Sequence, residues 1–404
     1  YNFLRQSTPG VYPMYDGRFG GAVAAEESVQ LNNLMQYLYE PQGMDKVSNF
    51  NSTIFANLKI IKGLTFETKF NYQMRSREQT GSSIPVDKYS FETNKIVYPA
   101  GVVSTLTLSQ GYENLRTLTF DNVLRYETSI GKHNIGALLG HNEFQTKWYT
   151  FSASKRGVID PTISNIGTAN EMNSIDGNEY QTGMRSFFGR VNYDFDGKYL
   201  VELNLRRDAS SKFGKDKQVG YFPSVGLGWL LSKESFMKGL EPYVQNVKLR
   251  GSWGKLGNDR NNGDPNNENY FPALAFFGNA GYSFGGSQVG GLELSRFGNR
   301  LLAWEESENK EAGLEFSTFQ KKAYVELNYY NKLTSGILVP DQLPLAAGTT
   351  APPIVNSASM RNSGIELNLT WKDKIGEVSY SIGGNFAYNK NSITKLKGQL
   401  NRGW

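Results

Sequence analysis

The sequence predicts an all-β protein that crosses a lipid bilayer as an antiparallel up-and-down β-barrel. Three observations support this fold class. Apolar and polar residues alternate with a period of two over long segments, and tight turns alternate with long polar connections. No apolar run approaches the roughly 18 residues that a membrane-spanning helix needs. The composition agrees, because 24 Phe, 23 Tyr and 43 Gly among 404 residues suit long strands and sharp turns.

The segment 199–232 shows the alternation most clearly. In an extended chain, successive side chains point to opposite faces, so a period of two separates two environments. The apolar face comprises Tyr199, Val201, Leu203 and Leu205 before a polar loop, and Tyr221, Val225, Leu227, Trp229 and Leu231 after it. The opposite face comprises Glu202, Asn204, Arg206 and Asp208, followed by Ser224, Gly226, Gly228 and Ser232.

The same period recurs along the chain and predicts about twelve strands between residues 54 and 390. The predicted segments are 54–60, 64–74, 118–126, 133–139, 187–195, 199–205, 221–231, 247–253, 312–316, 323–329, 365–371 and 378–388.

The connections between these segments alternate in length. Tight turns rich in Gly, Asp and Lys are predicted at 62–63, 131–132, 196–197, 320–321 and 373–376. Long polar connections are predicted at 76–111, 151–182, 257–305 and 334–361, a shorter loop at 209–218, and a medium turn with a helical element at 233–245. A meander of this kind has its short turns at one end and its long loops at the other.

This polarity favours a membrane barrel over a soluble sheet. Soluble strands are usually about 5 to 6 residues long, whereas many of these segments exceed ten. Outer-membrane barrels combine longer strands with short periplasmic turns and long outer loops. The apolar face would then contact lipid, and Trp229, Trp253 and Trp371 would lie in the interfacial aromatic girdles. The alternative is a soluble sandwich, propeller or β-helix, but no repeat of fixed period supports the latter two.

Several functional classes are excluded by composition and spacing. The chain has no Cys, which excludes disulfides, thiolate metal sites and a cysteine nucleophile. His133 and His141 have no neighbouring carboxylate spacing that suggests a catalytic triad or a zinc site. Adjacent Glu305 and Glu306 point apart in an extended chain, so no enzyme is predicted. The net charge is +5 without a basic stripe, which argues against nucleic acid.

The residues from Asn204 to Met237 resemble a characteristic barrel segment of SusC/RagA-type TonB-dependent outer-membrane transporters. Its elements are Asn204-Leu205-Arg206, Asp208, Ser211, Phe213-Gly214, Phe222-Pro223-Ser224, Gly228-Trp229, Glu234 and Phe236-Met237. Later segments are also similar to the family, namely Val247 to Asn258, Trp304-Glu305, Leu314-Glu315-Phe316, Asn328-Tyr329-Tyr330 and Asn362 to Glu366; near the start, Met14 to Gly21 resembles an early loop.

The resemblance implies that residues 1–404 are part of one barrel domain of about 22 strands with a plugged lumen. The opening YNFLRQSTPG is not a signal peptide, so we expect the signal peptide, the TonB-contacting segment, the plug and the final strands to lie outside this sequence. The resemblance also implies import of oligosaccharides or peptides across the bacterial outer membrane, with a SusD-like surface lipoprotein as lid and TonB as energy source. A non-importing surface-binding or scaffold barrel and a soluble β-rich hydrolase remain as alternatives.

Two sets of residues are candidates for the functional site. Aromatic residues in the long loops suit carbohydrate or peptide ligands, because rings stack on apolar faces while amides bind hydroxyls. Alternatively, they pack the loops on one another or on a partner protein. These aromatic candidates are Tyr89, Phe91, Tyr270, Phe271, Tyr282 and Phe284. The second set comprises the family-motif residues Arg206, Asp208, Phe213, Gly214, Phe222, Pro223 and Ser224, of which Arg206 and Asp208 could form a charged network against the plug.

The loop GNDRNNGDPNNEN (257–269) is rich in oxygen ligands. It does not match the EF-hand register, because Gly263 falls at a ligand position and no Glu closes the loop. A structural calcium ion at Asp259 and Asp264 is one reading of this loop, and a polar outer loop without metal is the alternative. No other cofactor is predicted.

Overall fold

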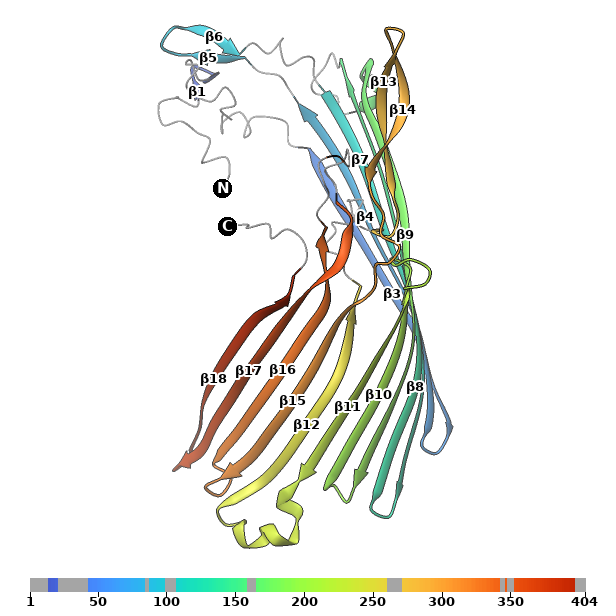
Figure 1. Ribbon diagram of the computed structural model, residues 1–404. Helices are drawn as coiled ribbons and strands as arrows, with labels where there is room; N and C mark the ends of the chain where they lie inside the picture. The colour runs from blue at the N-terminus through green and yellow to red at the C-terminus, as the bar shows by residue number, and fades with distance from the viewer. Residues whose placement is uncertain are drawn as a thin grey trace. The chain divides into compact units, whose positions relative to one another are not determined.

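A computed structural model describes residues 14–20, 43–83, 87–98, 107–157, 165–259, 271–341, 346 and 352–396 (Figure 1). Twelve of its strands form one antiparallel sheet in the order β18-β17-β16-β15-β12-β11-β10-β9-β8-β7-β4-β3. These strands are β3 (Met44–Ile61), β4 (Leu64–Ser83), β7 (Thr107–Ile130), β8 (His133–Arg156), β9 (Glu171–Phe195), β10 (Tyr199–Ser210), β11 (Val219–Leu230), β12 (Val244–Asn258), β15 (Glu305–Thr318), β16 (Ala323–Pro340), β17 (Ile354–Ile375) and β18 (Val378–Lys395).

The chain divides into two compact units. Unit one comprises residues 1–52, 72–117 and 146–181, and unit two comprises 53–71, 118–145 and 182–404. Within unit one, β1 (Met14–Tyr15), β2 (Arg18–Gly20), β5 (Lys88–Ser90) and β6 (Lys95–Tyr98) form a small four-stranded sheet. Unit two contains the short turns and most of the twelve-stranded sheet, which we call the wall.

Eleven of the twelve predicted segments lie within one strand of the large sheet each, and the segment 221–231 exceeds β11 by one residue, because Leu231 begins a 3-10 helix. Figure 1 shows that the short turns of unit two lie at the same end of the strands. The medium connection contains two 3-10 helices, η3 (Leu231–Lys233) and η4 (Ser235–Leu240). One turn differs slightly, because β17 continues through Ile375 and the turn falls at 376–377 rather than 373–376.

The long connections were predicted too long. The strands of the large sheet have 12 to 25 residues, and β9 begins at Glu171, inside the predicted connection 151–182. Likewise β13 (Phe276–Phe284) and β14 (Ser287–Arg296) form a hairpin inside the predicted loop 257–305. The physical reason is that a hydrogen-bonded ladder between strands needs no apolar face, so polar segments extend it without a period-two signal.

The two faces of the wall in unit two differ in chemistry. Leu203 is 49% exposed and Leu227 57% exposed, although both are large apolar side chains. They share one face with Tyr193, Val191 and Phe187, because β9 and β10 pair without a register shift. Polar residues of alternate positions lie on the opposite face. An apolar surface of this extent is compatible with hydrocarbon and not with water.

Within the described residues, none of the helices is long and apolar enough to cross a membrane.

Candidate functional site: the polar wall and its outer mouth

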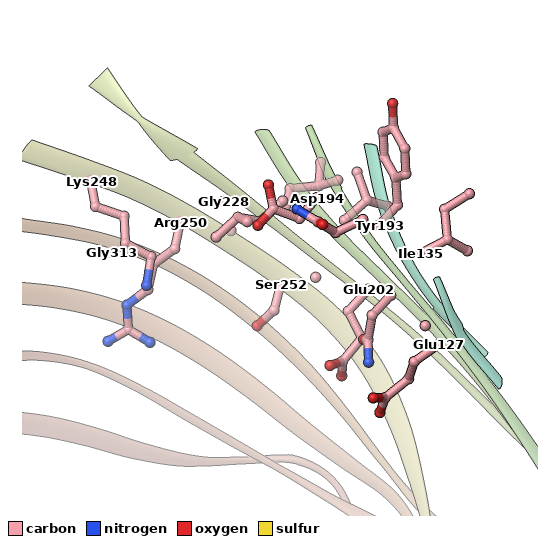
Figure 2. A pocket seen from close by; sticks show the side chains of 18 of the residues that line it. Glu127, Ile135, Tyr193, Asp194, Glu202, Gly228, Lys248, Arg250, Ser252 and Gly313 are labelled. Carbon is pink, nitrogen blue, oxygen red and sulfur yellow. The ribbon is translucent and has the colours of Figure 1, made fainter. Parts of the chain in front are cut away.

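A broad cavity lies on the polar face of unit two, with a volume of about 1140 Å³. Figure 2 shows Glu127, Glu202, Ser252 and Arg250 on one side of the strands, whereas Tyr193 points away from them. The polar residues that line the cavity include Glu127, Asn134, Asn192, Asp194, Glu202, Lys248, Arg250, Ser252, Glu311 and Asn328. Glycines 136, 226, 228 and 313 line it as well, so backbone is accessible between the polar groups.

Arg250 is the centre of a charge network on this wall. Its Nη2 atom donates to Glu326 Oε1 at 2.7 Å and to Asn328 Oδ1 at 2.6 Å. Its Nε atom lies 3.1 Å from Glu315 Oε1. Gly313 is paired with Arg250 across the strands, and a Cβ atom at residue 313 would lie 2.7 Å from Arg250 Nε. The glycine therefore makes room for the guanidinium.

A second polar ladder crosses β9, β10 and β11. Arg190 Nε donates to Asn204 Oδ1 at 2.6 Å, and Asn204 Nδ2 donates to Glu202 Oε1 at 2.8 Å and to Ser224 Oγ at 3.1 Å. Such satisfied networks hold polar side chains in fixed positions. The wall can hydrate a lumen and bind polar solutes, but no nucleophile lies beside a general base in these two networks.

Two of the family-motif residues, Phe213 and Phe222, lie at the loop end of unit two in a small hydrophobic cluster, which we call the mouth cluster. It consists of Phe213, Phe222, Leu302 and Trp304, with Leu302 0% exposed. The Trp304 ring centroid lies 5.2 Å from that of Phe213 and 5.3 Å from that of Phe222. Trp304 Nε1 donates to the carbonyl of Gln218 at 3.0 Å. Sequence reasoning singled out both phenylalanines but missed Leu302, which lies outside any period-two segment.

Gly214 and Pro223 have clear local reasons for their identity. A Cβ atom at Gly214 would lie 2.4 Å from the carbonyl oxygen of Arg300, so only glycine fits the close backbone approach. Pro223 pairs with Leu205 of β10, whereas the β11–β12 pairing begins only at Ser224. A proline is tolerated here because the ladder on its other side has ended.

Arg206 and Asp208 form an ion pair within the wall itself. Arg206 Nε donates to both carboxylate oxygens of Asp208 at 2.8 Å, and its Nη2 donates to Ser186 Oγ at 2.9 Å. The guanidinium also lies 5.5 Å from the ring centroid of Phe188. Asp208 is 7% exposed and Ser186 is fully buried, so these contacts are satisfied inside the wall.

The candidate aromatic residues belong to different units. In unit one, Tyr89 lies under Arg18 at 5.2 Å, and the Phe91 ring centroid lies 5.7 Å from that of Tyr15. These contacts pack the small sheet.

In unit two, Phe271 precedes β13, Tyr282 lies on β13, and Phe284 ends that strand with 69% exposure. Tyr270 lies outside the described residues.

Asp259 has protein partners at its carboxylate. Oδ2 accepts from Ser210 Oγ at 2.9 Å and lies 3.5 Å from Lys212 Nζ. The Asp259 carboxylate thus has a hydroxyl donor and a cationic side chain beside it. Asp264 lies outside the described residues. In the parts of the chain that the structure describes, no group of three or more His, Cys, Asp or Glu side chains could hold a metal ion.

The short-turn end carries two acidic groups with shifted pKa values. The Lys132 ammonium donates to Asp196 at 2.9 Å, and this hydrogen bond lowers the pKa of the Asp196 carboxyl. Hydrogen bonds from the Tyr199 hydroxyl and the Trp229 indole lower the pKa of Glu234. Trp229 lies at the short-turn end of β11, and its indole N–H donates to the Glu234 carboxylate at 3.2 Å. Its place in an interfacial girdle stays a prediction.

A meandering antiparallel wall with one apolar and one polar face defines an outer-membrane β-barrel. The model of the family "TonB dependent receptor-like, beta-barrel" matches residues 2–403, and the chain belongs to this family. Its members are transporters of the outer membrane and not enzymes. The predicted SusC/RagA resemblance and fold class are thereby confirmed.

Individual relatives agree with this assignment. The chain is 29% identical over 354 residues to TonB-dependent receptor P3 of Formosa agariphila, covering 87% of the chain and 33% of the relative. It is 32% identical over 215 residues to TonB-dependent receptor SusC of Bacteroides thetaiotaomicron, covering 53% and 21%. The structure of the RagAB peptide transporter matches with a TM-score of 0.79 at 22% identity, covering 95% of the chain and 41% of that structure, which is evidence for the fold alone.

The chain spans 33% of the length of TonB-dependent receptor P3 and 21% of the length of SusC.

Proposed function

We propose that this chain forms part of the barrel of a TonB-dependent importer of oligosaccharides or peptides across the outer membrane. The observation that carries the proposal is the two-faced wall of unit two. Its apolar face suits hydrocarbon, and its polar face carries the Arg250 network and the broad cavity, as a hydrated lumen requires. Similarity to SusC of Bacteroides thetaiotaomicron and to the RagAB fold favours nutrients over other solutes.

We further propose that residues 1–404 belong to one barrel domain of about 22 strands. In this proposal the remaining strands and the plug come from other parts of the protein, and TonB acts through that plug. A SusD-like surface lipoprotein would cover the loop end as a lid. The similarity to RagAB, a two-component assembly by its name, supports a partner of this kind.

Uptake by the intact protein tests the proposal. Cells that carry the full-length protein should accumulate a labelled oligosaccharide or peptide mixture, and deletion of TonB should abolish this accumulation. Liposomes that contain the intact protein should stay closed to the same solutes. Equal passage into liposomes without TonB would instead identify an open porin.

The same experiment separates the scaffold alternative from the importer. A surface-binding barrel would retain the labelled ligand at the cell surface, and TonB deletion would leave that retention unchanged. The importer requires ligand inside the periplasm.

A further inference from the structure

The apolar face of unit two has a groove at its loop end, with a volume of about 600 Å³. Its lining includes the small residues Gly183, Ala209 and Ser211. The apolar residues Phe70, Leu118 and Phe120 line it as well, together with the charged residues Arg185 and Glu143. Volumes of roughly 300 to 1,000 Å³ are typical of ligand sites.

Strand register shows that this groove faces away from the lumen. Ala209 pairs with Arg185 and Arg207 pairs with Phe187, in the same unbroken register that pairs Leu203 with Val191. Alternate positions of a strand share a face. Arg185, Arg207 and Ala209 therefore lie on the face of the exposed Leu203.

Residue counting places the groove at the outer border of the hydrocarbon. Arg185 lies ten residues from Phe195, at the short-turn end of β9, and Glu143 lies ten residues from His133, at the short-turn end of β8. A tilted membrane strand crosses the bilayer in about 9 to 11 residues.

On β12 and β15, the charged side chains of this face lie at a similar distance from the short turns. Lys255 Nζ lies 3.2 Å from Glu306, and Lys310 Nζ lies 3.1 Å from Glu308. The groove thus lies at the level of the outer headgroups.

The charges around the groove leave an excess of positive charge. Arg185 Nε donates to Glu143 Oε1 at 2.5 Å, and the Arg185 side chain remains 63% exposed. His141 Nε2 lies 3.5 Å from the same carboxylate. Arg207 is a diagonal neighbour of Arg185, within about 7 to 8 Å between Cα atoms. Among the described residues, the Arg207 guanidinium forms no ion pair with a carboxylate.

We propose that this groove binds a phosphorylated glycolipid of the outer leaflet. Arg185 and Arg207 would bind a phosphate oxygen, and an acyl chain would lie over Gly183 and Ala209 against Phe70 and Phe120. Guanidinium groups suit phosphate because they donate planar pairs of hydrogen bonds. The occupant is a lipid of the outer leaflet because the groove adjoins the loop 211–218, at the end opposite to the short turns.

Lipid retention by the intact, detergent-purified protein tests this site. Native mass spectrometry would follow binding of phosphorylated lipid A, dephosphorylated lipid A and phosphatidylglycerol. We expect the wild type to prefer phosphorylated lipid A, and a variant with Arg185→Gln and Arg207→Gln to bind it about tenfold more weakly. Arg190→Gln is the matched control, since Arg190 lies on the lumen face of the same strand.

A second variant tests the groove without changing charge. Ala209→Leu fills the groove with an apolar side chain that lipid tolerates, and it should lower lipid A retention several-fold. Heat-modifiable migration would confirm that each variant is folded. Equal retention by wild type and both variants would overturn the proposal. Equal binding of dephosphorylated lipid A would exclude the phosphate contact, and equal binding of phosphatidylglycerol would exclude the glycolipid.

Discussion

The mouth cluster and the lipid-facing wall use the same residue types in opposite surroundings. In the mouth cluster, Leu302 and Trp304 are covered by protein on all sides. On the wall, Leu203 and Leu227 are about half exposed although they belong to the same unit. Side chains of equal hydrophobicity are thus stabilised by packing in one region and by hydrocarbon in the other. Substitutions in the mouth cluster should therefore change stability through packing, and substitutions on the wall should change it through contact with hydrocarbon.

The largest effect is expected in the mouth cluster. Trp304→Ala removes the ring that contacts Phe213 and Phe222 and leaves a cavity, which should lower the free energy of unfolding by about 3–5 kcal/mol. A urea titration of the intact protein, monitored by the migration of unboiled samples on a gel, would measure this loss of stability. Leu227→Ala, on the lipid-facing wall, is the control, and an equal loss there would contradict the distinction.

A charge on the lipid-facing wall should have the next largest effect. Leu203 lies near the middle of the membrane-spanning part of β10, and Leu203→Arg should cost about 2–4 kcal/mol in stability because the guanidinium would face hydrocarbon. The same titration in lipid vesicles would measure the cost. Ser252→Arg introduces the same group on the polar face, opposite Glu311, and should be nearly neutral. A similar loss for both variants would mean that the two faces are not different solvents.

A smaller loss of stability is expected beside the mouth cluster, where the backbone at Gly214 approaches the backbone at Arg300. Gly214→Ala places a methyl group against the Arg300 carbonyl and should cost about 1–3 kcal/mol, because the loop must shift. Gly226→Ala is the matched control, since its Cβ would meet only Glu202 Cβ, at 3.8 Å. Thermal unfolding of both variants would decide whether the loop 211–218 can relax; a neutral Gly214→Ala would show that it can.

The smallest effect concerns pH at the short-turn end. The pKa of Glu234 is lowered in the folded state, chiefly by the hydrogen bond from Tyr199. The carboxylate therefore stabilises the fold above the ordinary pKa of 4.5, and this contribution is lost as pH falls through the lower folded value. We expect the melting temperature of the wild type to fall more between pH 7 and pH 3 than that of Glu234→Gln. Equal slopes would contradict a role for this carboxylate.

The sequence predicted the fold well because lipid imposes a strict period of two. Every strand had to present apolar residues such as Leu203 at alternate positions, and the short turns required Gly and Asp. Outside the membrane this requirement ends, so the outer half of β9 and the β13–β14 hairpin carried no comparable signal. Leu302 was missed for a related reason, because its burial depends on Phe213 and Phe222, which are distant in sequence. The candidate ligand residues remain a prediction.

The two edge strands of the large sheet determine how this part of the protein behaves when it is produced alone. In the described sheet, β3 and β18 each have a neighbouring strand on one side only. Backbone amides and carbonyls along such a border are costly in hydrocarbon and attract other chains in water. Residues 44–396 produced alone should therefore associate through these two strands even in detergent, and recovery of a monomer in detergent should require that both strands be supplied with partners.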